Sequence, residues 1–168
     1  MHKQTTPDEW FPLVNEKGKT IGKATRSECH NGSKLLHPVI HLHIFNNAGK
    51  LYLQKRSKYK DIQPGKWDTA VGGHIDYGEL VLDALQREAR EELGITDFTP
   101  TFLHQYLFES TIERELVYSY KTIYSEHIHP DHDEVEDGRF WSIEEIRSKM
   151  KLGVFTPNFE YEFQLLFT

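Results

Sequence analysis

The chain has 168 residues, 38% of them hydrophobic and 27% charged, which is ordinary for one soluble globular domain with a single core. Its net charge of −6 argues against a nucleic-acid polymer as partner, but a local basic pocket could still bind a small phosphorylated ligand. The one cysteine, Cys29, excludes an internal disulfide, and without a signal peptide or an apolar run of roughly 20 residues we expect a cytoplasmic protein with no membrane contact.

The N-terminal part of the chain is predicted to consist of short strands. Residues 10–15 and 19–25 read as two strands around a turn at 16–18. Residues 39–45 and 51–57 alternate apolar and polar side chains, and the sequence NNAG between them is typical of a turn. We therefore expect these two segments to form a hairpin.

A strand at 68–75 precedes the clearest helical pattern, which covers residues 79–93. Leu85 and Ala89 follow each other at i+4 on one apolar stripe, and Leu82 widens it. This pattern predicts an amphipathic helix with one buried face.

The C-terminal half alternates β-rich and polar segments before ending in helical patterns. In order, these elements are two paired strands at 99–111 and 115–127, a polar loop at 127–138, a strand at 139–142 and helices at 142–150 and 156–167. Strands on both sides of one central helix indicate a mixed α/β fold in a single domain.

The central helix carries a crowded set of acidic side chains. On a helical wheel Glu88, Glu91 and Glu92 fall within an arc of about 100° beside the apolar stripe, while Arg87 and Arg90 project toward the opposite side. Like charges spaced i, i+4 destabilise a helix by a few tenths of a kcal/mol, and partial burial raises that cost. A hard divalent cation would remove the repulsion because it prefers carboxylate oxygens. Relief by the arginines on a solvated face is the alternative.

The spacing of Gly73, Glu79 and the run from Arg87 to Ile95 resembles the Nudix box of the Nudix hydrolase superfamily. Ala89 stands where that pattern often has a bulkier aliphatic residue. The resemblance implies a Nudix α/β/α sandwich with a mixed β-sheet and a loop–helix–loop motif at 73–95. It also implies one domain over residues 1–168, in which residues 1–28 form an N-terminal β extension.

The resemblance further implies a hydrolase that uses Mg²⁺ or Mn²⁺ to cleave a diphosphate linked to another group. Such a metal polarises a phosphoryl oxygen and activates water, and a nearby carboxylate takes the proton. We favour Glu91 as this base, with Glu115 and Glu134 as alternatives. The implied metal ligands are Glu88, Glu91, Glu92 and the carbonyl of Gly73, while Arg87 and Glu79 orient the helix and the loop.

Over nearly the whole chain the order of segments is also similar to the type I isopentenyl-diphosphate isomerases and to uncharacterised hydrolases grouped with them. That group has a metal site of three histidines and two glutamates, and mixed N and O donors suit Mn²⁺, Zn²⁺ or Mg²⁺. His41 and His43, in contrast, read as ordinary strand residues. The positions that match the metal site are His30, His37, His74, Glu113 and Glu115.

Three basic residues match the isomerase positions that hold the diphosphate, namely Arg26, Arg56 and Lys60. A guanidinium fork suits phosphate oxygens, so these residues are candidates for substrate binding. We therefore expect a small diphosphate-containing substrate as the partner. The sequence does not decide whether the chain forms a homodimer.

One departure separates the two chemistries. The isomerases use a cysteine just before the glycine of the box, and that position is Gly72 here. Cys29 is distant in sequence and is predicted to be a plain buried thiol. With an intact acidic helix, this departure favours hydrolysis of a phosphoanhydride in a nucleoside diphosphate derivative or a related organic diphosphate. Isomerase activity, with Glu115 and water replacing the thiol, and a binding module without turnover are the alternatives.

Overall fold

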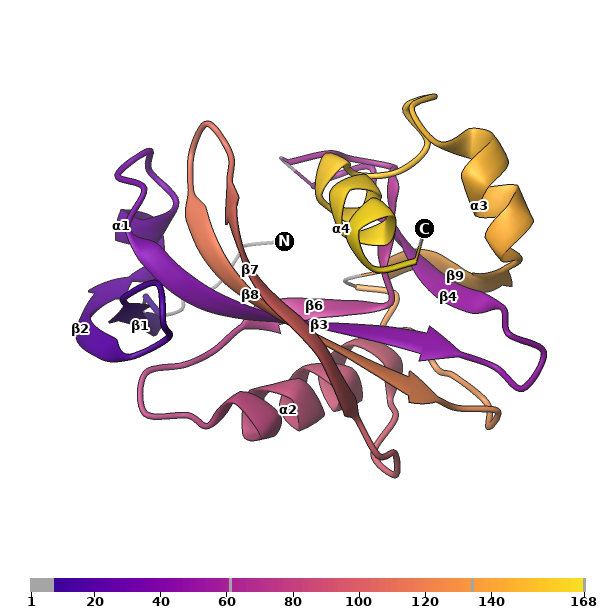
Figure 1. The fold of residues 1–168 in the computed structure, drawn as a ribbon, viewed down its shortest axis with the longest axis horizontal. Coiled ribbons are helices and arrows are strands. Elements are labelled where there is room, and N and C mark those ends of the chain that lie inside the picture. The colour runs from indigo at the N-terminus through magenta and orange to yellow at the C-terminus, as the bar shows by residue number, and fades with distance from the viewer. Residues whose placement is uncertain (1–7, 61, 134, 168) are drawn as a thin grey trace.

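The computed structural model describes residues 8–60, 62–133 and 135–167. Figure 1 shows the arrangement of its strands and helices. In chain order these are β1 (Trp10–Val14), β2 (Thr20–Thr25), α1 (Arg26–Cys29), β3 (Leu36–Phe45), β4 (Leu51–Arg56), β5 (Trp67–Thr69), β6 (Val71–His74), α2 (Val81–Leu93), β7 (Thr101–Glu109), β8 (Arg114–Ile123), β9 (Val135–Trp141), α3 (Ile143–Lys149) and α4 (Pro157–Phe167).

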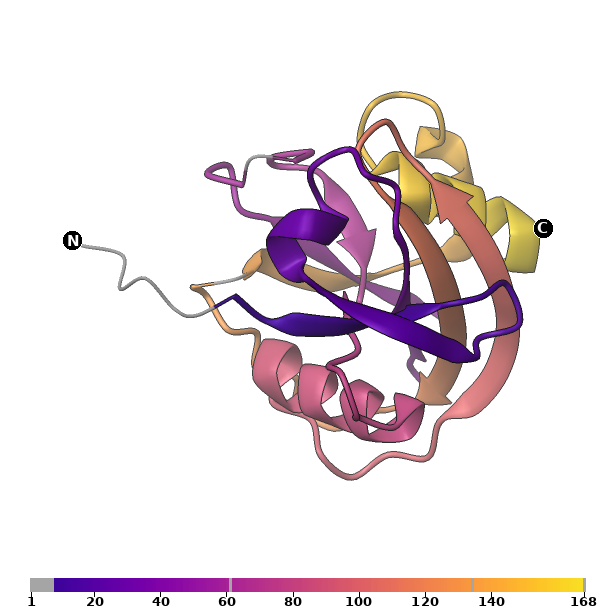
Figure 2. The same cartoon turned by 90° about the vertical axis from the view of Figure 1, so that its left-hand side faces the viewer.

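A mixed sheet forms the middle layer. Its strands follow the order β5-β4-β3-β8-β7, with β6 paired to β3 and β9 paired to β4. Strand β8 runs parallel to β3 along its whole length, whereas β6 and β7 pair antiparallel to their neighbours. Helix α2 covers one face of this sheet and α4 covers the other, as the two views agree (Figures 1 and 2). The predicted α/β/α sandwich with a mixed sheet is confirmed.

The core between α2 and the sheet explains why α2 forms where it does. Leu85 and Ala89 are fully buried and pack with Ile40 and Leu42 of β3. Each buried leucine or isoleucine contributes about 1.5–3 kcal/mol, so this face fixes the helix against the sheet. The prediction that Leu82 joins the buried stripe is wrong, because its side chain is 51% exposed.

Helix α2 begins two residues later than the sequence predicts. Glu79 stays in the loop before the helix, where its carboxylate accepts a hydrogen bond from the backbone N–H of Asp76 at 3.1 Å. Leu80 takes the N-cap position in extended conformation, and Gly94 ends the helix in the left-handed conformation at φ 68°. The hydrogen bond of the Glu79 side chain therefore sets where α2 starts, and the apolar pattern alone places that start too early.

Two strand predictions need correction. The turn at Asn46 forms, but β3 and β4 share only the pair Phe45 and Leu51, because β6 occupies the rest of that edge of β3. Strand β9 starts at Val135 rather than at residue 139, because β4 supplies a pairing partner for the polar segment before it. Both differences come from pairing with strands that are distant in sequence.

The predicted strand at 68–75 divides into β5 and β6, which pair with β4 and β3, and the remaining predicted elements are confirmed with small shifts at their ends. Strands β1 and β2 form a separate antiparallel pair, and β7 and β8 pair as predicted. Ser142 caps α3 by accepting the backbone N–H of Glu145 at 3.0 Å. The short helix α1, which sequence patterns did not indicate, is capped by Thr25. None of the helices in the described ranges combines the length and apolar character needed to cross a membrane.

Candidate metal centre and active site

The Glu88 side chain of α2 lies so close to the end of β6 that a side chain at Gly73 would displace it. A Cβ atom at Gly73 would lie 2.6 Å from Oε1 of Glu88, inside normal contact distance. The absence of a side chain thus lets the Glu88 carboxylate lie directly against the backbone of Gly73. The structure brings together these two predicted metal ligands from different elements.

Arg87 ties the loop before α2 to the acidic side chains. Its Nε and one terminal nitrogen donate to the two carboxylate oxygens of Glu79 at 2.9 and 3.0 Å. The other terminal nitrogen donates to Glu88 at 2.8 Å and to Glu91 at 3.4 Å. The prediction that Arg87 projects away from the glutamates is wrong, because its long side chain folds back over them. None of these contacts reaches Glu92.

Glu92 lies deeper than the other two glutamates. Its carboxylate accepts the backbone N–H of Gly72 at 3.2 Å and the side-chain amide of Gln54 at 3.3 Å. Burial raises the pKa of Glu92 well above its usual range, and the charge of Glu88 adds to the effect. The Glu91 side chain, in contrast, is 55% exposed. The set therefore combines two sheltered carboxylates with one that faces water.

The buried carboxylates fit a divalent cation. Burial raises the pKa of Glu88 to about 7, and the neighbouring Glu91 and Asp76 add to the shift while Arg87 opposes it. Ionising both Glu88 and Glu92 therefore costs the fold free energy that a cation with oxygen preference would offset. The donor set and its excess negative charge match Mg²⁺ or Mn²⁺.

We predict that Glu88→Gln stabilises the metal-free protein, increasingly so as the pH rises. The folded-state pKa of about 7 lies above the ordinary value of 4.5, so ionisation destabilises the fold above that lower value, fully so by about pH 8. Urea unfolding with a chelator should show the variant gaining on the order of 2–3 kcal/mol over the wild type between pH 5 and pH 8. Glu144→Gln, on the exposed face of α3, should show no such trend. A gain independent of pH would contradict the prediction.

We also predict that Gly73→Ala weakens metal binding. The added methyl group forces Glu88 out of its place against β6, and displacing one ligand should lower Mn²⁺ affinity at least roughly tenfold. The matched control is Gly22→Ala in β2, where a Cβ meets only Leu13 at 3.9 Å. Titration calorimetry with Mn²⁺ compares the two variants. Equal affinities would show that Gly73 does not position the carboxylate.

A second group of potential ligands includes His74, which follows Gly73 at the C-terminal end of β6. The ligand atoms of His30, His37, His74 and Glu113 all lie within 4.8 Å of one another. The Nε2 atom of His30 is 3.1 Å from Nε2 of His74 and 3.0 Å from a carboxylate oxygen of Glu113. We refer to these four residues as the His₃Glu set. They come from the C-cap of α1, from β3, from β6 and from the β7–β8 turn, so only folding brings them together.

The protonation of the His₃Glu set favours metal binding. Nδ1 of the buried His37 lies 2.9 Å from the carbonyl of Leu35, which fixes Nδ1 as the donor. Its Nε2 atom has no hydrogen-bond partner within the described residues and points its lone pair at the set. Burial lowers the pKa of His37 and lowers that of His74 well below its usual range. A neutral imidazole that has one nitrogen without a hydrogen-bond partner is a suitable metal ligand.

The N-terminal hairpin shields the His₃Glu set from solvent. Phe11 of β1 is fully buried and stacks on His74 with ring centroids 4.4 Å apart and nearly parallel planes. The same ring lies 5.9 Å from that of His37. The N-terminal extension therefore supplies a wall of this site.

Glu115 lies apart from the His₃Glu set. It is adjacent to His37 across β3 and β8, but its carboxylate is not among the four ligands that converge. Burial raises the pKa of Glu115 to about 8, with the charge of Glu113 adding to the shift. The remaining alternative for the base, Glu134, lies outside the described residues.

The three predicted substrate-binding cations come from three different segments of the chain. Arg26 lies in α1, pairs with Glu9 at 3.4 Å, and its charge acts on His74. Arg56, at the end of β4, lies 3.6 Å from Asp68. Lys60 lies in the turn after β4, where its backbone N–H donates to the carbonyl of Ser57.

Cys29 is a buried free thiol. Burial raises the pKa of this thiol to about 11, as expected for a structural cysteine.

The sequence did not indicate a buried polar cluster under α4. Glu162 is fully buried and lies 2.8 Å from Nδ1 of His41 and 3.1 Å from Nε2 of His43. Ser119 of β8 donates to the other carboxylate oxygen. Within the described residues neither ring nitrogen of His43 completes a well-aligned hydrogen bond. The alternation of side chains along β3 predicts that both histidines lie on one face of the sheet. No local sequence pattern predicts that Glu162, which is distant in sequence, contacts them.

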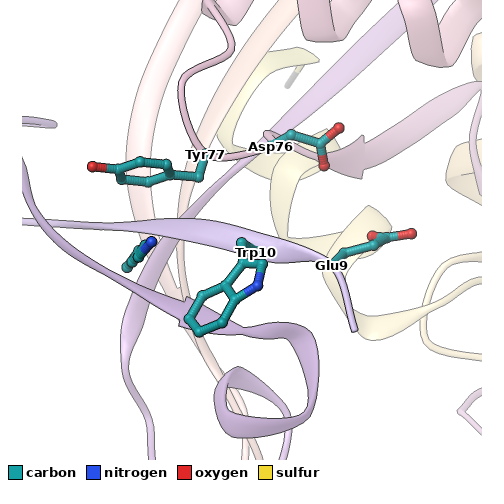
Figure 3. Close-up of a pocket in the computed structure, with 5 residues that line it drawn as sticks. Glu9, Trp10, Asp76 and Tyr77 are labelled. Carbon is teal, nitrogen blue, oxygen red and sulfur yellow. The ribbon is translucent and has the colours of Figure 1, made fainter. Parts of the chain in front are cut away.

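A shallow cavity of about 390 Å³ opens beside the loop that precedes α2. Figure 3 shows Asp76 and Tyr77 of that loop opposite Glu9 and Trp10. The backbone N–H of Tyr77 donates to the carbonyl of Trp10 at 2.8 Å, and Nζ of Lys23 lies 4.9 Å from the Trp10 ring centroid. These contacts join the N-terminal hairpin to the loop.

The profile of the NUDIX domain family matches residues 35–159. An isopentenyl-diphosphate Delta-isomerase of Mycolicibacterium vanbaalenii is 32% identical over 156 residues, which cover 89% of this chain and 86% of that protein. An uncharacterised Nudix hydrolase of Listeria monocytogenes is 35% identical over 158 residues, which cover 90% of each protein.

Two solved structures show the same fold at low identity. A Deinococcus radiodurans protein superposes with a TM-score of 0.83 at 22% identity, covering 95% of this chain and 100% of that one. The NUDIX domain of Shewanella oneidensis NrtR, solved with ADP ribose, has a TM-score of 0.56 at 17% identity, covering 66% of this chain and 75% of that one.

Proposed function

Because the chain belongs to the Nudix family, we propose that it is a metal-dependent hydrolase of a nucleoside diphosphate derivative or a related organic diphosphate. The observation that carries this proposal is the gathering of Glu88 and Glu92 against the Gly73 end of β6, with Glu91 exposed beside them. Three carboxylates so close together gain most from a divalent cation, and Mg²⁺ is commonly bound by carboxylates together with substrate phosphates.

In the proposed mechanism Glu88, Glu91, Glu92 and the Gly73 carbonyl hold Mg²⁺ or Mn²⁺. The bound cation would polarise a phosphoryl oxygen and lower the pKa of water. Arg87 positions Glu88 and Glu91 through its hydrogen bonds of 2.8 and 3.4 Å. Glu91 is the proposed base because its exposed carboxylate can accept a proton from water attacking phosphorus.

The diphosphate is proposed to lie toward Arg56. The side chain of Arg56 is anchored by its Nε, which donates to the carbonyl of Ile62 at 3.1 Å, and by the ion pair with Asp68. An anchored guanidinium offers its remaining donors in a fixed plane that suits phosphate oxygens. Arg26 begins α1, directly after the N-terminal hairpin of β1 and β2, and Lys60 lies after β4. We propose both as further contacts to the diphosphate.

A substrate panel tests the proposed function. Purified protein is incubated with Mg²⁺ or Mn²⁺ and nucleoside diphosphate sugars, ADP ribose, dinucleoside polyphosphates and prenyl diphosphates, and products are identified by ³¹P NMR. ADP ribose is included because the NrtR domain was solved with it. The expected result is release of phosphate monoesters from at least one class. No product from any class with either metal would refute hydrolysis.

Isomerase activity is the second candidate function, because a relative with that name is 32% identical and the His₃Glu set matches the isomerase ligand positions. Gly72 stands where the isomerases carry a cysteine, so this chain lacks that group for proton transfer. Incubation of isopentenyl diphosphate in D₂O distinguishes the two reactions. Deuterium in the prenyl chain with the diphosphate intact would establish isomerisation, and we expect none.

A further inference from the structure

The buried polar cluster under α4 consists of His41, His43, Ser119 and Glu162. Within it, the His41 ring lies nearest to Gly72 and so to the candidate active site. In β3, Ile40 and Leu42 point to the core with α2, so His41 between them points to the α4 face of the sheet. There Nδ1 of His41 is bound by the fully buried Glu162 at 2.8 Å. A buried carboxylate is stable as an anion only when it is paired and hydrogen-bonded, and Glu162 meets both conditions through His41 and Ser119.

The other side of the His41 ring lies against Gly72. Strand pairing places His41 directly opposite Gly72, and a Cβ there would be 3.4 Å from Cδ2 and 3.8 Å from Nε2 of the imidazole. The backbone N–H of Gly72 donates to Glu92 at 3.2 Å. A single glycine therefore separates the imidazole from the most buried candidate metal ligand.

The Nε2 atom of His41 remains available for a ligand. Its side chain is 12% exposed, and the described part of the chain offers Nε2 no hydrogen-bond partner. A histidine that served only to neutralise Glu162 would need no exposed edge. Here Nε2 lies beside Gly72, which has no side chain to cover it.

The surroundings of His41 keep the ring cationic at neutral pH. Burial alone would lower its pKa, but the charge and hydrogen bond of Glu162 raise the pKa of His41 to about 9. Glu115 of β8 and Asp68 of β5 act in the same direction. The same ion pair holds the pKa of Glu162 far below its usual range.

We propose that His41 is a substrate-contacting residue whose Nε2–H donates a charge-assisted hydrogen bond to a phosphoryl oxygen of the bound diphosphate. Glu162 is a positioning residue that orients the ring through Nδ1. This inference rests on the proposed function, because it places the diphosphate between the carboxylates of α2 and the α4 face. An imidazolium donor to phosphate is among the stronger hydrogen bonds in proteins.

The direct test uses methylenediphosphonate with Mg²⁺, a diphosphate analogue that water does not cleave at its bridging carbon. In wild-type protein labelled with ¹⁵N-histidine, the Nε2 signal of His41 should shift on titration with this probe, while that of the exposed His104 should not. The measurement needs no substitution. An unmoved His41 signal at the highest soluble concentration of the probe overturns the proposal.

Variants then measure the contribution of the contact. His41→Gln should weaken binding of the probe roughly tenfold, as expected for loss of a hydrogen bond to a charged group, and the control His104→Gln should leave it unchanged. Wild-type affinity in His41→Gln would overturn the proposal.

Glu162→Gln tests the positioning role through a pH profile. The wild-type pH profile between about pH 6 and pH 8 should contain no loss of the His41 proton, because the pKa of His41 lies near 9, and it is the reference for the variant. Without the Glu162 charge, the ratio of variant to wild-type affinity should fall over that range as His41 loses its proton. An unchanged profile overturns the role of Glu162.

The outcomes separate this inference from the proposed function. A shifted His41 signal in a protein that hydrolyses no member of the substrate panel would refute hydrolysis but retain the diphosphate contact. Metal-dependent hydrolysis with an unmoved His41 signal would support hydrolysis and refute the contact between His41 and the diphosphate.

Discussion

Glu92→Gln is expected to lower the rate of phosphoanhydride hydrolysis by at least roughly 100-fold, the usual effect of removing one preorganised charge from an active site. The amide keeps the size of the side chain and can still accept the N–H of Gly72, so the fold around β6 should persist. What the variant lacks is the anionic oxygen proposed to bind metal. Steady-state assays with saturating Mg²⁺ on an accepted substrate measure the change.

The matched control for Glu92→Gln is Asp83→Asn on the same helix. Asp83 is exposed in the first turn of α2, and its substitution removes the same unit of charge. Activity should stay near the wild-type value. Comparable losses in both variants would mean that the net charge of the helix, rather than a ligand at Glu92, controls the reaction.

His37→Phe is expected to abolish metal binding at the His₃Glu set. Phenylalanine keeps a flat ring beside Phe11 but lacks the unpartnered Nε2 that points into the set. In the wild type, Zn²⁺ or Mn²⁺ should raise the melting temperature, because a ligand that binds only the folded state stabilises it by mass action. In His37→Phe with Glu92 also changed to glutamine, that rise should disappear.

Two control variants, Glu92→Gln alone and His127→Ala, complete that experiment. Glu92→Gln alone should retain the metal-induced rise from the His₃Glu set, and His127→Ala should behave as the wild type because His127 is an exposed residue. An undiminished rise in the double variant would show that the histidines bind no metal.

Local sequence patterns were sufficient for the elements whose partners are close along the chain. The i+4 repeat around Leu85 predicted α2, whereas the pairing of Glu88 with Gly73 was expected only from the resemblance to the Nudix box. Arg87 was misplaced because a helical wheel fixes the direction of Cβ but not the end of a long side chain. The structure was needed to show that this guanidinium donates hydrogen bonds to two of the three glutamates.

Contacts between distant segments could not be predicted from one sequence. Strand β9 was cut short because its polar start depends on pairing with β4. The ion pair of His41 with Glu162 joins β3 to α4, and no spacing rule links such positions. The His₃Glu set was predicted only through a family resemblance, since its members come from four elements.

The most direct measurement is hydrolysis of an accepted diphosphate substrate in ¹⁸O-labelled water with Mg²⁺. The proposed mechanism predicts that a phosphate-containing product carries ¹⁸O on phosphorus, and that a chelator and Glu92→Gln each suppress its formation. Cleavage that continues at the same rate with the chelator, or a product labelled on carbon instead of phosphorus, would contradict it.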